Sequence, residues 1–175
     1  FSGSLTAAIV REDGADKIEL EEAYLETLDG SFLDNTFFKF GRAFWNVGTL
    51  NPQHAHADDF ADRPLPYRVF LNKAYNDDGL EASYLFGSSE IGFGIFRGED
   101  FPFGNTAGSE GSGSDAWSAF YKSTLNLSNT EELAFNLYHL SGKSKSPNAR
   151  LGNEDTVTFS GDSDLSIINL DYENS

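Results

Sequence analysis

The sequence has no cysteine, no methionine and only 5 proline residues among its 175 residues. Without cysteine it can form no disulfide framework and offers no thiolate chemistry, so redox usage does not indicate a cellular compartment. Long apolar runs are also missing. No stretch of about 18 apolar residues predicts a transmembrane helix, and no basic segment followed by an apolar one predicts a signal peptide. A membrane location would therefore have to depend on strands.

Basic residues are scarce: 12 Lys and Arg stand against 28 Asp and Glu, which gives a formal net charge of −16. This balance opposes binding to nucleic acid or to anionic lipid, so no nucleic-acid partner is expected. It suits cation-attracting loops or a plain acidic surface. The length fits a single domain over residues 1–175. Because the chain opens on Phe1 and runs at once into a strand-like segment, we expect a processed or excerpted polypeptide.

Aromatic residues and glycine are abundant, with 16 Phe, 7 Tyr, 2 Trp and 17 Gly. This mixture suits strands and turns. Apolar and polar residues alternate along several segments, as the period of two in a strand requires. With one apolar run near the start, eight strands are predicted, at about residues 5–10, 18–28, 38–45, 80–86, 91–95, 117–125, 133–137 and 168–172.

The predicted connections alternate in length from the second strand onward. Short turns are expected at residues 29–35, 87–89 and 128–130. Long polar loops are expected at about residues 46–79, 98–114 and 141–164. Only the first connection, residues 11–17, is shorter than this alternation predicts. Short turns at one end and long loops at the other are typical of outer-membrane barrels. The predicted fold is all-β: an antiparallel up-and-down membrane-type β-barrel, or part of one, with about eight strands.

A soluble β-sandwich is the alternative, because it also produces half-buried alternating strands. Aromatic residues near the predicted strand ends favour the barrel, where aromatic girdles mark the two membrane interfaces. These residues are Trp45, Tyr67, Phe96, Phe101, Phe103, Trp117 and Tyr138.

One set of segments resembles a poorly characterised group of bacterial outer-membrane proteins, often labelled zinc-regulated or TonB-dependent outer-membrane receptors. The most specific part runs from His54 to Pro64, within residues 50–65. The other segments are residues 21–27, Phe40-Gly41-Arg42-Ala43-Phe44, and residues 67–71, 76–80, 96–102 and 159–165. The resemblance implies a barrel in the bacterial outer membrane. It also implies a longer parent protein with a signal peptide and a terminal aromatic strand, whereas no TonB box or plug domain is visible here.

A loop metal site is one interpretation of the histidines near the centre of the chain. In an extended segment His54 and His56 point the same way, and Asp58, Asp59 and Asp62 follow closely. Imidazole and carboxylate are ligands that suit Zn²⁺. The alternative is that these residues fold the loop through hydrogen bonds to the backbone, with an aspartate capping a short helical turn that Pro64 and Pro66 limit.

Four further charges, Arg63, Arg68, Asp77 and Asp78, are candidate loop or lumen charges that tie the long loop to the barrel wall. Ordinary surface ion pairs are the alternative. Catalysis finds no support, because the sequence has neither a G-x-S-x-G elbow nor a G-x-x-x-x-G-K-S/T loop. His139 is expected to be interfacial or hydrogen-bonded. No enzyme activity and no required cofactor are predicted.

The sequence therefore predicts a porin-like or receptor-like barrel in the bacterial outer membrane that passes or binds small solutes or metal ions through extracellular loops. Its expected partners are outer-membrane lipid, the solute or ion, and either further copies of itself or the missing remainder of the barrel. Two alternatives stay open: a soluble acidic β-sandwich that serves binding or adhesion, and an exported fragment that self-assembles through strand edges.

Overall fold

The computed structural model describes residues 1–12, 15–28, 33–53, 62–71, 74–104, 115–145 and 160–174. In this part of the chain, eight strands form one antiparallel sheet in the order β1-β2-β3-β4-β5-β6-β7-β8. The strands are β1 (Ser2–Glu12), β2 (Ala15–Glu26), β3 (Thr36–Phe44), β4 (Asn76–Phe86), β5 (Ser89–Phe96), β6 (Ala116–Asn126), β7 (Glu131–Lys145) and β8 (Ser160–Asn174). The prediction of an all-β, up-and-down fold with eight strands is confirmed, and the sheet is open, with β1 and β8 at its edges.

The alternation of connections is also confirmed. Short turns join β2 to β3, β4 to β5 and β6 to β7, and the long connections lie at the other end of the strands. Several loop bounds were wrong, because β4 already begins at Asn76, β7 extends to Lys145 and β8 starts at Ser160. The ends of these strands are polar, so the alternation of apolar residues does not predict them.

The one helix in the described residues is α1 (Leu65–Leu71), which lies in the connection between β3 and β4. Pro64 and Pro66 stand at the start of this helix, and the helical turn before them that Asp58 or Asp59 is predicted to cap lies outside the described residues. A proline in the first turn loses no intrahelical hydrogen bond, since the first N–H groups of a helix have no partner within it. No helix in the described ranges is long and apolar enough to cross a membrane.

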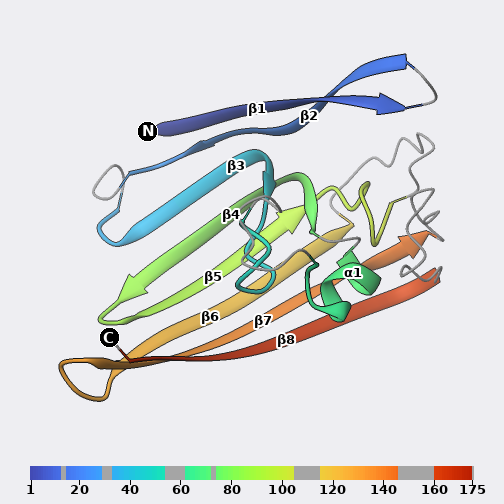
Figure 1. The fold of residues 1–175 in the computed structure, drawn as a ribbon. Helices are drawn as coiled ribbons and strands as arrows, with labels where there is room; N and C mark the ends of the chain where they lie inside the picture. The colour runs from blue at the N-terminus through green and yellow to red at the C-terminus, as the bar shows by residue number, and fades with distance from the viewer. Residues whose placement is uncertain are drawn as a thin grey trace.

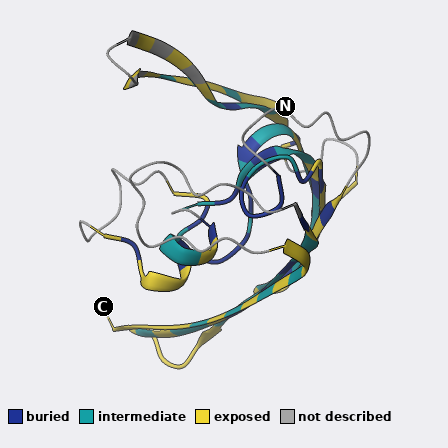
Figure 2. Cartoon of the chain, turned by 90° about the vertical axis from the view of Figure 1, so that its right-hand side faces the viewer, coloured by how far each residue is buried: buried dark blue, intermediate teal, exposed yellow. Residues whose placement is uncertain are grey.

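The sheet curves into an open arc, and the described parts of the connection between β3 and β4 lie on its concave side (Figures 1 and 2). We call residues 45–53, 62–71 and 74–75 the inner segment, and the sheet face toward it the inner face. The β1–β2 hairpin leans away from the arc (Figure 1), because only four residue pairs, from Ala23↔Arg42 to Glu26↔Lys39, join β2 to β3.

Strand register separates two kinds of side chain. One row across the opposite, outer face runs through Leu25, Phe40, Leu80, Ile95 and Trp117. The adjacent row on the inner face runs through Lys39, Glu81, Gly94, Ser118 and Leu140. The outer face is therefore mainly apolar, and the inner face mixes charged, small and aromatic residues.

Glycines on the inner face leave room for aromatic rings. A Cβ atom at Gly92 would collide with the ring of Phe120 on the neighbouring strand. The far edge of the ring thus occupies the space that a side chain at Gly92 would need, and the same side of the sheet can hold both a bulky ring and the inner segment.

Candidate functional site

The inner segment is fastened to the sheet first by an apolar core. Trp45, Val47, Leu71 and Tyr75 are almost completely buried, with exposed fractions of 0–1%. They pack against residues from the sheet and from the turn after β5. The sheet and turn contribute Ala43, Phe96, Phe103, Ala116 and Leu140, with Leu165 and Ile167 at the margin.

This core corrects one prediction. Of the seven aromatic residues expected in membrane girdles, Trp45, Tyr67, Phe96, Phe101, Phe103 and Tyr138 are buried, with exposed fractions of 0–8%, and only Trp117 is exposed on the outer face. Position near a strand end does not tell which face a ring occupies. Rings near the long-loop end pack beneath the inner segment, because burial there removes apolar surface from water.

Asn51 holds the two ends of the inner segment together. Its side-chain amide donates to the carbonyl oxygens of Trp45 and Tyr75, each at 2.8 Å. Its Oδ1 accepts a hydrogen bond of 2.6 Å from the backbone N–H of Tyr75. The side chain is fully buried, so these bonds satisfy main-chain groups that water cannot reach.

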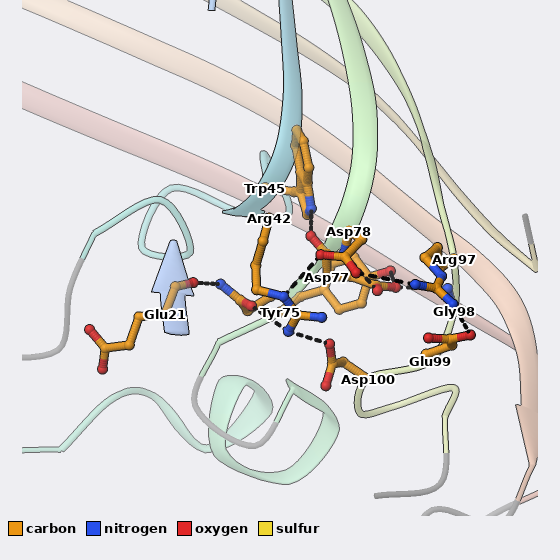
Figure 3. A network of polar contacts seen from close by, with 11 residues as sticks. Glu21, Arg42, Trp45, Tyr75, Asp77, Asp78, Arg97, Gly98, Glu99 and Asp100 are labelled. Carbon is orange, nitrogen blue, oxygen red and sulfur yellow. Dashed lines mark hydrogen bonds and ion pairs between the residues drawn. The ribbon is translucent and has the colours of Figure 1, made fainter. Parts of the chain in front are cut away.

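Asp77, on β4, joins the inner segment to the sheet (Figure 3). Its carboxylate accepts hydrogen bonds from the Tyr75 hydroxyl at 3.0 Å and from the backbone N–H of Gly98 at 2.7 Å. Its main-chain carbonyl accepts from Nε1 of Trp45 at 2.9 Å. Burial raises the pKa of Tyr75 well above its usual value, with the Asp77 charge adding to the effect. Tyr75 therefore stays a hydrogen-bond donor at neutral pH.

Asp78 lies on the opposite face of β4 and belongs to a network of charges at the rim (Figure 3). Its Oδ1 accepts from Nε of Arg42 at 2.9 Å, and its Oδ2 lies 3.5 Å from Nη1 of Arg97. Arg42 also donates to Asp100 at 2.9 Å, and Arg97 donates to Glu99 at 2.6 Å. Asp77 and Asp78, adjacent in sequence, thus serve different faces, as strand geometry requires.

A second polar cluster connects the inner segment to the middle of the sheet. Asn46 donates from Nδ2 to Glu81 at 2.5 Å and accepts from Nζ of Lys122 at 2.7 Å. Lys122 also lies 3.4 Å from Glu90, and the Nζ of Lys39 lies 4.1 Å from the ring centroid of Tyr24. A cavity of about 220 Å³ opens beside this cluster. It is lined by Glu26, Thr27, Phe37, Phe38, Lys39, Asn46, Glu81, Ser83 and Glu90.

Gly48 and Tyr67 determine how tightly the inner segment folds. Gly48 has a φ of 92°, which few other residues adopt, and a Cβ there would overlap the Tyr67 hydroxyl. That hydroxyl accepts a hydrogen bond of 3.4 Å from the backbone N–H of Leu50. Burial is the main cause that raises the pKa of Tyr67.

The predicted metal ligands His54, His56, Asp58 and Asp59 lie outside the described residues, and Asp62 is exposed. Within the ranges that the structure describes, no group of three or more His, Cys, Asp or Glu could hold a metal ion. A zinc site in the loop therefore stays a prediction.

The other predicted loop charges have varied surroundings. Arg63 is 6% exposed and donates to the backbone carbonyl of Gln53 at 2.5 Å, so it lies within the inner segment. Arg68 is half-buried on α1. His139 shares a hydrogen bond of 3.0 Å with the Ser166 hydroxyl and lies 3.6 Å from Asp164.

Several residues with structural roles were not predicted. Asn51, Asn46, Glu81 and Lys122 carry the connections between the inner segment and the wall. A polar residue on a strand predicts only the face on which it lies. Alternation predicts that Glu81 and Leu80 lie on opposite faces of the strand. It does not predict that Asn46, in a distant connection, is the hydrogen-bond partner of Glu81.

The fold and its site define an all-β protein with a single up-and-down sheet and a long connection folded onto the inner face. No family model and no solved structure matches the chain. An uncharacterised protein of Aquifex aeolicus (strain VF5) is similar, with 35% identity over 74 residues, which is 42% of this chain. The match spans only 15% of that protein's length.

Proposed function

We propose that the chain forms part of the wall of a bacterial outer-membrane β-barrel and that its long-loop end passes or binds small solutes. The observation that carries this proposal is the exposure of large apolar side chains along the outer face. They come from all eight strands, with Leu5 and Ile9 on β1. Among them are Leu25, Phe40, Leu80, Tyr84, Ile91, Phe93, Ile95, Trp117, Leu125, Phe135, Leu137, Ile168 and Leu170.

Such a surface is costly in water. Exposed apolar area costs about 25 cal/mol per Å², and monomeric soluble proteins rarely expose continuous apolar patches larger than a few hundred Å². In a barrel, the outward residues of each strand are apolar and the inward residues are polar. The outer face follows this pattern, whereas the inner face mixes charged residues with the apolar residues packed beneath the inner segment.

The ends of the outer face also favour a membrane. The apolar rows give way at the long-loop end to Arg42, Asp78 and Arg97, whose charges pair with one another and with Asp100 and Glu99. Charged residues that pair beside an apolar band suit the level of lipid headgroups.

The inner face supports the solute-related part of the proposal. It carries Lys39, Glu81, Glu90 and Lys122 around a polar cavity of about 220 Å³. Asn46 of the inner segment lines this cavity, so the inner segment would narrow a passage along the inner face. A receptor function and regulation by zinc are supported by the sequence resemblance alone.

A test can use the two tryptophans, since one lies on each face. Trp45→Phe leaves Trp117 as the only tryptophan, and Trp117→Phe leaves Trp45. Each variant is reconstituted into vesicles whose acyl chains carry bromine, a short-range quencher. We expect strong quenching of Trp117, which is 39% exposed on the outer face, and little quenching of Trp45, which is fully buried.

The matched vesicles without bromine provide the control. If Trp117 is no more quenched than Trp45, or if the protein stays monodisperse in buffer without detergent and does not enter vesicles, the outer face is not a membrane surface. A protein partner would then be the better explanation of the apolar rows.

A further inference from the structure

A serine, a histidine and an aspartate meet on the outer face of the sheet. His139 of β7 contacts two residues of β8: its Nδ1 lies 3.0 Å from the Ser166 hydroxyl oxygen, and its Nε2 lies 3.6 Å from Oδ1 of Asp164. Ser166 is opposite His139 in the strand register, and Asp164 is two residues away on the same face of β8. The three side chains come together through strand pairing, so no local sequence motif encodes them.

The Asp164 carboxylate determines which nitrogen of a neutral His139 carries the proton. An ionised carboxylate accepts hydrogen bonds and cannot donate them, so the Nε2 that faces it carries the N–H group. Nδ1 is then unprotonated and accepts a hydrogen bond from the Ser166 hydroxyl. A base that contacts a serine hydroxyl and is itself oriented by a third group is the arrangement that activates a serine nucleophile.

The ring of Trp117 limits the movement of this histidine. The ring centroids of Trp117 and His139 are 5.1 Å apart, at an interplanar angle of 47°. Trp117 also stacks on Phe93, so the imidazole packs against a pair of aromatic rings. Packing that fixes the orientation of a base favours a reaction over free rotation.

An apolar groove of about 590 Å³ crosses the outer face and reaches His139. The volume lies in the range of sites that hold small molecules. Two adjacent outer-face rows form its sides, one through Tyr84, Ile91 and Tyr121, and the other through Phe93, Ala119 and His139. A flexible hydrocarbon chain suits such a groove, because burying it removes apolar surface from water.

The serine lies near the charged end of the outer face. Asp164 belongs to the row that runs through Leu80 and Trp117, and this row is adjacent to the one that holds Arg42 and Asp78. Arg42 and Asp78 are among the paired charges that suit the level of lipid headgroups. In an ester lipid, the ester bonds join the headgroup region to the acyl chains, and Ser166 lies between the rim charges and the apolar band.

We propose that Ser166 and His139 hydrolyse carboxylic esters of long-chain fatty acids on the outer face, with Asp164 positioning His139 and the acyl chain in the groove. The choice of a membrane lipid as the ester rests on the proposed membrane function. Ser166 Oγ attacks the ester carbonyl carbon while its proton passes to Nδ1 of His139. The bond from this carbon to the alcohol oxygen breaks, and the alcohol leaves with the proton.

Water completes the cycle. It adds to the carbonyl carbon of the acyl-serine and gives a proton to Nδ1 of His139. The bond to Ser166 Oγ breaks, the fatty acid leaves, and Nδ1 returns the proton to the serine. His139 is thus base and then acid in each half of the reaction.

The first test measures hydrolysis of 4-nitrophenyl decanoate by the full chain in detergent micelles. Ser166→Ala should lower kcat by about 100-fold or more, since the nucleophile is removed. Ser141→Ala is the matched control, because Ser141 lies on the same face opposite Asp164, and it should leave the rate unchanged. A phosphonofluoridate with an alkyl chain should attach to Ser166, which mass spectrometry of peptides detects.

The opposite results are equally clear. Equal rates for Ser166→Ala and Ser141→Ala, no hydrolysis above that of the micelles alone, or attachment of the probe to another serine would each overturn the proposal. Both variants change an outer-face serine to alanine, so loss of folding does not explain a difference between them.

Asp164→Asn tests the positioning role. It should lower kcat for the decanoate ester by about tenfold or more, because a neutral amide no longer fixes the proton on Nε2. KM should stay the same, since Asp164 does not contact the acyl chain. A rise in KM with kcat unchanged would show that Asp164 does not orient the base.

Ala119→Leu tests the groove, because Ala119 lies between Phe93 and His139 in the register. The larger side chain should raise KM for the decanoate ester severalfold and leave hydrolysis of 4-nitrophenyl acetate unchanged. An equal effect on both esters would overturn the assignment of the chain to the groove. Esters in micelles reach Ser166 without a bilayer, and bromine quenching of Trp117 does not need Ser166. Failure of hydrolysis is therefore distinguishable from failure of the membrane proposal.

Discussion

The two tryptophans show how differently the two faces of one sheet are used. Trp45 is fully buried on the inner side, and its Nε1 donates to the Asp77 carbonyl. Trp117 is 39% exposed on the outer face, where it stacks on Phe93 with a centroid separation of 6.0 Å. Strand alternation decides the face of each residue, but burial depends on what covers that face. In the described residues, the inner segment covers the inner face of the sheet and leaves the outer face uncovered.

The same difference holds for polar groups. On the inner side, Asn51 and Glu81 are buried with hydrogen-bond partners from distant parts of the chain. On the outer side, Arg42, Asp78 and Arg97 gather where the apolar rows end. The inner face behaves like a protein interior, whereas the outer face leaves large apolar side chains exposed.

The first prediction contrasts the two faces directly. Trp45→Ala should lower the free energy of unfolding by about 3–5 kcal/mol, because it removes a large buried ring and leaves a cavity under the inner segment. Trp117→Ala in lipid should cost only about 1 kcal/mol, because only part of the ring is buried and lipid can close around the smaller side chain. Urea unfolding in vesicles, followed by circular dichroism, measures both values.

Equal losses for the two variants would contradict the contrast. That result would mean that a protein surface packs tightly around Trp117, or that Trp45 is not part of a close-packed core. The variants remove the same side chain, so the comparison does not depend on the type of residue.

The second prediction concerns the amide that closes the inner segment. Asn51→Leu should lower the free energy of unfolding by about 2–4 kcal/mol, since it leaves the Tyr75 carbonyl and N–H buried without their Asn51 partners and leaves the Trp45 carbonyl with the Val47 N–H alone. Asn126→Leu, at an exposed position at the end of β6, is the matched control and should change stability by less than about 0.5 kcal/mol. Similar values for both variants would show that the Asn51 bonds add no net stability.

Much of the fold could be predicted because its signals are local. Alternation of apolar and polar residues located seven strands and an apolar run located the first, and the lengths of the connections gave the up-and-down order. Strand ends were predicted less well. The segment that extends β7 to Lys145 is Ser141-Gly142-Lys143-Ser144-Lys145. It has no apolar alternation, and it is a strand because it pairs with β8.

The site was harder to predict because its contacts are long-range. Lys122 reaches Asn46, 76 residues away, and Asn76 reaches the Glu21 carbonyl, 55 residues away. No local pattern encodes such a partner. The prediction that aromatic residues form membrane girdles was wrong for the same reason. Only the folding of the inner segment determines that Phe96 and Phe103 lie beneath it.

The third prediction tests the close contact between Gly92 and the ring of Phe120 on the inner face. Gly92→Ala should lower the free energy of unfolding by about 1–3 kcal/mol, because its Cβ meets the ring of Phe120 and the inner face must shift. Phe120→Leu combined with Gly92→Ala should cost less than the sum of the two single changes, since the smaller side chain makes room for the methyl group. Additive losses in urea unfolding would show that Phe120 moves freely away from Gly92. The position of Phe120 would then depend on the inner segment rather than on its contact with Gly92.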